Sequence, residues 1–189
     1  MRTTLLPAAL LAGALPLGAA ADGVTDALDA ARAAYAQGDV SGALTALGTA
    51  RALLERQRAE SLADALPPAP GGWTRELDFE TTEAMATLGG GSGVEATYAG
   101  PSATFTVKIL ADGPMLLSMA PVLGNPELAP SFGGSFVPLG GVPVLEMDGR
   151  LQAMIGERYL IEASGADPDV MAPVFGAIDF QGLAELPAP

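Results

Sequence analysis

The sequence predicts an α+β fold, in which an antiparallel sheet is covered by helices and preceded by an αα-hairpin. Three observations predict it. Short apolar runs separated by turn dipeptides extend from 142 to 164, and apolar residues recur at helical spacing in 22–65. A further helix-like segment closes the chain after the last strand-like run, an order that favours an antiparallel over a parallel sheet.

The segment 142–164, VPVLEMDGRLQAMIGERYLIEAS, predicts a meander of three strands. Asp148-Gly149 accepts the positive φ that a two-residue hairpin loop requires, and Gly156-Glu157 marks the second turn. Leu151, Ala153 and Ile155 alternate onto one face of the middle strand. The sheet therefore has an apolar face that other segments must cover.

Residues 1–21 have the features of a secretory signal peptide: one arginine, an apolar Leu/Ala run and small residues at the end. A membrane anchor would need about 20 continuous apolar residues, and Pro7 and Pro16 interrupt this run. The chain has no cysteine, which excludes a lipid-modified N-terminus and disulfides. We expect a periplasmic or secreted protein without a membrane anchor after cleavage.

Residues 22–65 predict a helical hairpin that turns at Gly38, with Asp39 as the cap of the second helix. Residues 34–47, AYAQGDVSGALTAL, resemble the helical hairpin of a tetratricopeptide unit, but a solenoid needs about three such units. The second helix carries an apolar stripe of Ala43, Leu44, Leu47, Leu54 and Leu62.

Leu44, Leu47 and Leu54 are the predicted partner-binding residues, because an apolar stripe on a separate hairpin can receive a helix or a second copy of the chain. The alternative is that the stripe packs on the protein's own sheet, which is the commoner use of an amphipathic helix.

The Pro- and Gly-rich segment 66–72, LPPAPGG, is the predicted boundary between the hairpin and an α+β domain over 73–186, with a frayed tail at 187–189. In that domain the pattern predicts further strands and helices. The strands are 73–79, 94–99, 103–110 and 135–139, and the helices are 80–88, 114–124 and a closing helix that begins after Asp167.

Charge and composition exclude several functions. The chain has 22 acidic and 9 basic residues and a net charge of −13, which disfavours nucleic acid and anionic membranes as ligands. It has no histidine and no cysteine, and so lacks the usual general base, the thiolate nucleophile and nearly all zinc sites. We therefore expect no enzyme, no catalytic residues, no metal and no cofactor.

Three weaker signals have structural explanations. The glycine run 89–93 leads into a strand without a Walker lysine, so it predicts a connection and not a phosphate loop. Met115 and Met119 share a predicted helix face, where methionine usually fills core space and seldom binds copper. Asp167 and Asp169 are typical of a helix N-terminus, although with Ser164 they leave a carboxylate or serine hydrolase open.

The order of elements resembles the PsbP-like group of extracytoplasmic domains. The resemblance is carried by Gly72-Trp73, the strand ATFTVKIL, a following helix, the meander through ERYLIEASG and a closing helix that reaches Phe180. It implies a small α-β-α sandwich of the kind used in assembly and accessory modules, and not an enzyme. The chain departs from the group by its N-terminal hairpin and by the missing anchor cysteine.

Together these features predict a non-enzymatic accessory or protein-interaction module of the cell envelope. The hairpin is its expected surface for an envelope partner or for a homo-oligomer. The alternative is a small-molecule-binding domain with a pocket between the sheet and the helices.

Overall fold

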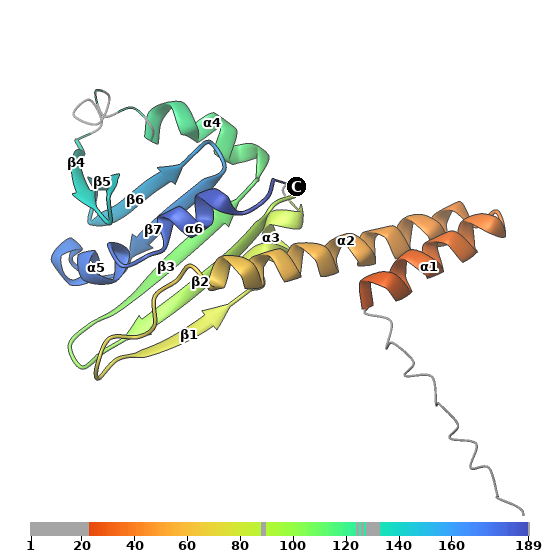
Figure 1. Ribbon diagram of the computed structural model, residues 1–189, viewed down its shortest axis with the longest axis horizontal. Helices are drawn as coiled ribbons and strands as arrows, with labels where there is room; N and C mark the ends of the chain where they lie inside the picture. The colour runs from red at the N-terminus through yellow and green to blue at the C-terminus, as the bar shows by residue number, and fades with distance from the viewer. Residues whose placement is uncertain (1–22, 88–89, 124, 126, 128–132, 189) are drawn as a thin grey trace, which may run out of the picture.

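The structure is a computed structural model that describes residues 23–87, 90–123, 125, 127 and 133–188. A pair of helices projects as an arm from a body that consists of one sheet and its covering helices (Figure 1). This arrangement confirms the predicted α+β class. The predicted signal peptide, residues 1–21, lies outside the described residues.

The sheet has seven strands in the order β1-β2-β3-β7-β6-β5-β4, and all neighbours are antiparallel. The predicted meander is confirmed as β5, β6 and β7, and Asp148 adopts the positive φ, 51°, that its turn requires. The strands are β1 Thr74–Asp78, β2 Ser92–Ala99, β3 Thr104–Ala111, β4 Ser135–Leu139, β5 Val142–Met147, β6 Arg150–Ile155 and β7 Tyr159–Ser164.

Helices cover both faces of this sheet (Figure 1). The end of α2 together with α5 and α6 shares the main core with the strands, whereas α4 covers a smaller cluster on the other face. The helices are α1 Gly23–Ala36, α2 Val40–Ala63, α3 Glu80–Thr87, α4 Pro114–Leu123, α5 Pro168–Phe175 and α6 Phe180–Glu185.

The main core is built from alternate residues of the central strands. Phe105, Val107 and Ile109 of β3 are at most 1% exposed, as the alternation of that strand predicts. Tyr98 stacks on Phe105 with ring centroids 5.3 Å apart, and Trp73 packs against the same phenylalanine at 5.6 Å. These aromatic contacts close the core at the turn between β2 and β3.

The other face of the sheet carries a row of polar residues in cross-strand register. Glu95, Lys108, Glu162 and Gln152 occupy matching positions on β2, β3, β7 and β6. Lys108 pairs with Glu95 at 2.8 Å, and Gln152 donates to Glu162 at 2.6 Å. The opposite charges of Lys108 and Glu95 on neighbouring strands support strand pairing on this polar part of the sheet surface.

The closing segment differs from its prediction as one helix. It forms α5 and α6, with a break over 176–179 where Asp179 caps α6 by accepting a hydrogen bond from Gly182 N at 2.8 Å. Asp179 N donates to the Ala65 carbonyl at 3.0 Å. The break thus joins the end of the chain to the end of α2.

The segment 66–72, the predicted boundary, lies against the sheet. Leu66 is 3% exposed and belongs to the main core. Arg75 donates to the carbonyls of Leu66 and Pro67 at 2.7 and 3.0 Å, and the Tyr98 hydroxyl donates to Pro67 at 2.7 Å. These contacts hold the passage from the arm to the sheet in a defined path.

Candidate functional site

The arm is an antiparallel helical hairpin with small residues at its contact. Ala27 and Ala31 of α1 are buried against α2, where Ala43 and Ala50 are buried in return. The turn follows the prediction: Gly38 has a φ of 78°, and Asp39 accepts a hydrogen bond from Gly42 N at 2.9 Å. Small side chains let the two helices approach closely.

One unbroken helix connects the arm to the body. The last turns of α2 bury Leu62, which is 0% exposed, in the main core, and α1 lies along the part of α2 that extends away from the body (Figure 1). The Arg56 guanidinium lies 4.4 Å from the ring centroid of Phe79 and adds a cation–π contact at the same end. The N-terminal part of α2, which extends away from the body, is therefore held rigidly because it continues the same helix whose C-terminal end is packed in the body.

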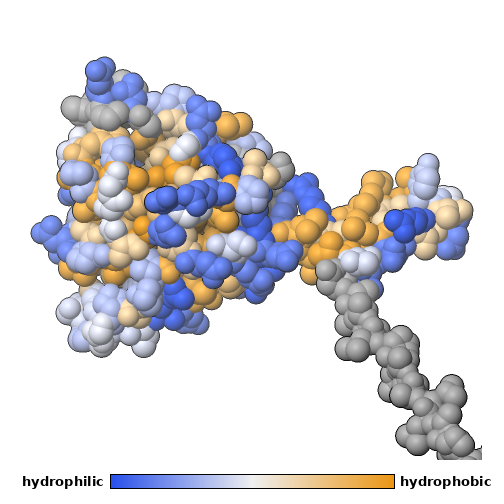
Figure 2. Space-filling view, in the orientation of Figure 1, coloured by the Kyte–Doolittle hydropathy of each residue, from blue (hydrophilic) through white to orange (hydrophobic). Residues whose placement is uncertain are grey.

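The predicted apolar stripe of α2 divides into three surfaces. Ala43 faces α1, Leu62 faces the sheet, and the predicted partner-binding residues remain exposed: Leu44 at 64%, Leu47 at 48% and Leu54 at 50%. Ala43 differs from Leu44 because one residue turns the helix by about 100°. Leu44 and Leu62 are about five full turns apart and point to the same side of α2, and they differ because only the end of the helix lies against the sheet. Figure 2 shows apolar surface along the arm.

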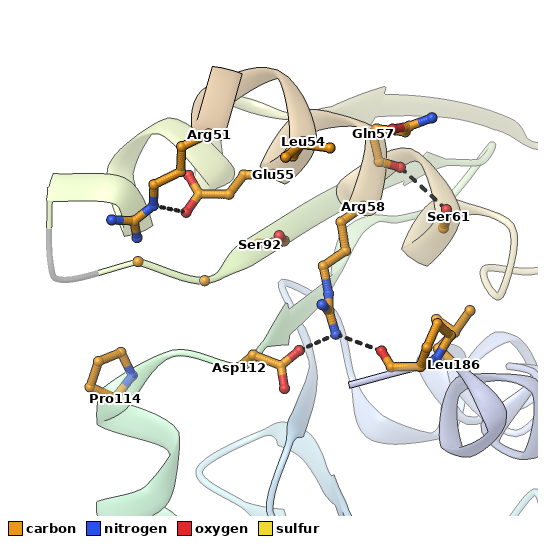
Figure 3. A pocket seen from close by; sticks show the side chains of 13 residues that line it. Arg51, Leu54, Glu55, Gln57, Arg58, Ser61, Ser92, Asp112, Pro114 and Leu186 are labelled. Carbon is orange, nitrogen blue, oxygen red and sulfur yellow. Dashed lines mark hydrogen bonds and ion pairs between the residues drawn. The ribbon is translucent and has the colours of Figure 1, made fainter. Parts of the chain in front are cut away.

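A cavity of about 700 Å³ lies where α2 enters the body (Figure 3). Four parts of the chain line it: the middle of α2, the run that leads into β2, the turn after β3 and the segment after α6. The lining residues are Arg51, Leu54, Glu55, Gln57, Arg58, Ser61, Gly90, Gly91, Ser92, Asp112, Pro114, Leu186 and Pro187.

Asp112 is the ionic centre beside this cavity. Its carboxylate accepts from Arg158 Nε at 2.9 Å and from Arg58 Nη2. The hydrogen bond to Asp112 raises the pKa of Arg158 above its ordinary value, although burial acts against the increase. Both arginines also donate to the Pro187 carbonyl, at 3.2 and 3.1 Å, which joins the C-terminal segment to the cluster.

Two buried polar atoms at the cavity have no hydrogen-bond partner among the described residues. They are Nε of Arg58 and Oγ of Ser92, and Ser92 is only 1% exposed. Arg51 pairs with Glu55 at 2.8 Å, as the i,i+4 spacing predicts, and its guanidinium lies against Gly90, where a Cβ would overlap it. Buried polar groups are ordinarily satisfied, so these two atoms require an explanation.

The alternative interpretation of the sequence expects a pocket between the sheet and the helices, but the pattern does not predict where this cavity lies or which residues line it. The glycine run 89–93 predicts a connection, yet Gly90 and Gly91 line the cavity with φ values of 108° and 113°. The available signal was that run together with Asp112-Gly113, where the aspartate has a φ of 55°. Neither feature indicates that Arg58 and Arg158 meet at Asp112.

The other candidates are placed apart from the cavity. Asp167 is the N-cap residue of α5 without a side-chain capping bond, and Asp169 lies in the first turn. Met115 is 53% exposed while its neighbour Leu116 is buried, so Met115 does not fill the core as the pattern predicted. Within the described ranges, no group of three or more Asp, Glu, His or Cys residues is arranged to hold a metal ion.

The chain matches no protein-family model, and neither the curated proteins nor the solved structures contain a significant match. Among the described helices, none has the length and apolar character needed to cross a bilayer.

Proposed function

We propose that the protein is a non-enzymatic accessory module of the cell envelope, exported by the signal peptide 1–21, whose arm docks a helix of another envelope protein. The observation that carries the proposal is the exposure of Leu44, Leu47 and Leu54 on a helix that is rigidly held by the body. Exposed apolar residues gathered on one element favour an interaction surface over ordinary surface scatter.

Both helices of the arm contribute to one apolar face. Leu28 follows the contact residue Ala27 by one position, and Leu44 follows Ala43 by one. Each step is a rotation of about 100° in the same sense, and because the helices are antiparallel, both leucines turn to the same side of the hairpin. Tyr35, which is 73% exposed and seven residues after Leu28, extends the face on α1. Leu47, three residues after Leu44, extends it on α2.

The face suits an amphipathic helix with basic residues beside its apolar stripe. Positions 41, 45, 48 and 52 flank the leucines with Ser, Thr, Gly and Ala, small residues that allow a second helix to approach closely. The chain carries a net charge of −13, so a basic partner gains attraction, whereas a second copy brings like charges together. The absence of histidine and cysteine from the sequence supports a binding role over catalysis.

The test is site-specific photo-crosslinking in the native envelope. A crosslinking residue at position 47 should capture the apolar side of a helix in another protein, and one at position 49, on the opposite side of α2, should not. In the chain that carries the crosslinking residue at position 47, Leu44→Lys should reduce capture at least about tenfold, since it places charge in the apolar contact. Leu117→Lys, an exposed leucine of α4 at 63%, is the matched control.

Two outcomes contradict the proposal. Equal capture from positions 47 and 49 would mean that the apolar face is not used. Capture of only the protein itself from position 47 would assign the face to self-association. Weakening of capture at high salt is expected for a basic partner.

A further inference from the structure

The cavity at the root of the arm has the size and the composition of a small-molecule site. Its volume of about 700 Å³ falls in the range of ligand pockets, which combine mostly apolar walls with a few polar groups. Leu54, Pro114, Leu186 and Pro187 supply apolar wall. The polar side chains come from α2 and, with Ser92 and Asp112, from the sheet side of the cavity (Figure 3).

The unsatisfied polar atoms define what a ligand must offer. Arg58 Nε can only donate, so its missing partner is an acceptor. The Ser92 hydroxyl, buried at 1% exposure and also without a partner among the described residues, can donate to an acceptor as well. An oxygen with free lone pairs satisfies both requirements.

The charges around the cavity favour an anion in a chain that is otherwise acidic. Arg51 and Arg58 line it together with two carboxylates, Glu55 and Asp112, and Arg158, which is not a lining residue, pairs with Asp112 in the same ionic cluster. Three positive charges against two negative ones leave a surplus of one. A monoanion balances this surplus, whereas a phosphate group at neutral pH brings close to two negative charges.

We propose that this cavity binds a small amphiphilic carboxylate, an unbranched or cyclic apolar body with a single carboxylate group. The carboxylate lies towards Arg58, Arg51 and Ser92, and the apolar body lies against Leu54, Pro114 and Leu186. The cavity shares Leu54 with the proposed docking face, whereas Leu44 and Leu47 are not among its lining residues, so variants at 44 and 47 separate the two proposals.

Decanoate, below its micelle concentration, is the probe, and the chain without residues 1–21 is the protein. Titration followed by amide chemical shifts should give saturable changes at Gly90, Gly91 and Ser92. Decanol has the same chain without the charge and should bind at least about tenfold more weakly, because it loses the charge-assisted hydrogen bonds. Inorganic phosphate should not compete.

Variants separate binding from folding. Arg51 has a side chain that is 61% exposed, so Arg51→Gln should fold normally and bind decanoate several-fold more weakly, while Arg51→Lys keeps the charge and most of the affinity. Ser92→Ala removes one hydroxyl and should also weaken binding. Leu44→Glu, on the same helix outside the cavity, should bind like the unsubstituted chain.

Several results would overturn the inference. These are the absence of shifts at the three amides up to the solubility limit, equal affinity for decanol and decanoate, or unchanged affinity in both Arg51→Gln and Ser92→Ala. Displacement of decanoate by phosphate would reject the amphiphile in favour of a simple anion site. None of these results bears on crosslinking from position 47.

Discussion

Arg158 donates from its Nε to Asp112 Oδ1 at 2.9 Å, although 46 residues separate the two in the sequence. The same carboxylate accepts from Arg58 of α2, so one aspartate links the arm helix, the end of β3 and the turn before β7. If one residue of a partly buried ionic cluster is neutralised, the remaining charges are neither fully solvated nor paired, and the folded state is destabilised.

Asp112→Asn is expected to lower the free energy of unfolding by about 2 kcal/mol, because two partly buried arginines lose their counter-charge. Asparagine tolerates the positive φ of position 112, so the backbone cost is small. Urea denaturation measures the change.

Asp148→Asn is the matched control, because Asp148 also has a positive φ, 51°, but is exposed in a hairpin turn. It should change the stability by less than about 0.5 kcal/mol. Equal losses in the two variants would show that the backbone, and not the ionic cluster, determines the effect.

Tyr98→Phe and Tyr159→Phe should differ in stability although both rings are buried. The Tyr98 hydroxyl donates to the Pro67 carbonyl at 2.7 Å, whereas the Tyr159 hydroxyl has no partner among the described residues. Removing the Tyr98 hydroxyl should cost about 1 kcal/mol, and removing the Tyr159 hydroxyl should be neutral or stabilising. Thermal unfolding of the two variants side by side measures the difference, and equal effects would contradict the hydrogen-bond assignment.

Tyr98 also predicts a loss of stability in alkali. Burial raises the pKa of Tyr98 above its ordinary value of 10.0, and the nearby Arg75 acts in the opposite direction. Its contribution to stability is therefore complete below about pH 10 and is lost as the pH rises through the folded-state pKa, by up to about 1.4 kcal/mol per pH unit. The free energy of unfolding of Tyr98→Phe should fall less steeply over that window, and parallel curves would contradict this prediction.

Leu62→Ala and Leu44→Ala, two changes on one helix, test how α2 is shared between core and solvent. Leu62 is 0% exposed in the main core, so truncation should cost about 2–5 kcal/mol. Leu44 is 64% exposed, and its truncation should cost less than about 0.5 kcal/mol in the isolated protein. Urea midpoints at equal slope give both values. A cost for Leu44→Ala similar to that for Leu62→Ala would mean that the arm face is buried in solution.

Thr82→Val tests whether the Thr82 hydroxyl satisfies the backbone hydrogen bonds of Gly93 in β2, beyond the last residue pair of β1 and β2. The Thr82 hydroxyl donates to the Gly93 carbonyl at 2.6 Å and accepts from Gly93 N at 3.0 Å, and the side chain is buried. Valine has nearly the same shape but leaves both backbone groups unpaired, at a cost of about 1–3 kcal/mol. Thr106→Val, on the polar face of β3, is the control with an expected change near zero. A neutral Thr82→Val would indicate that water replaces the hydroxyl.

The sequence predicts local elements better than the contacts between them. The turns at Gly38, Asp148 and Gly156 follow from backbone conformation, and the strand over 104–111 follows from alternation, because both depend on neighbouring residues. The meeting of Arg58, Asp112 and Arg158 depends on how α2 crosses the sheet, and no local pattern encodes it. The exposure of Leu44 but not Leu62 depends on where the helix leaves the body, for the same reason.

The unbroken course of α2 fixes a length and a phase between the tip of the arm and the cavity. Its 24 residues span about 36 Å, and each residue adds about 1.5 Å and 100° of rotation. An insertion of one residue after Gly48 would therefore turn the leucines at 44 and 47 by about 100° relative to the body, and it would also separate Ala43 from Ala50 on the side of α2 that packs against α1. The number of residues of α2 between these leucines and the body therefore sets the orientation in which an attached helix meets the sheet.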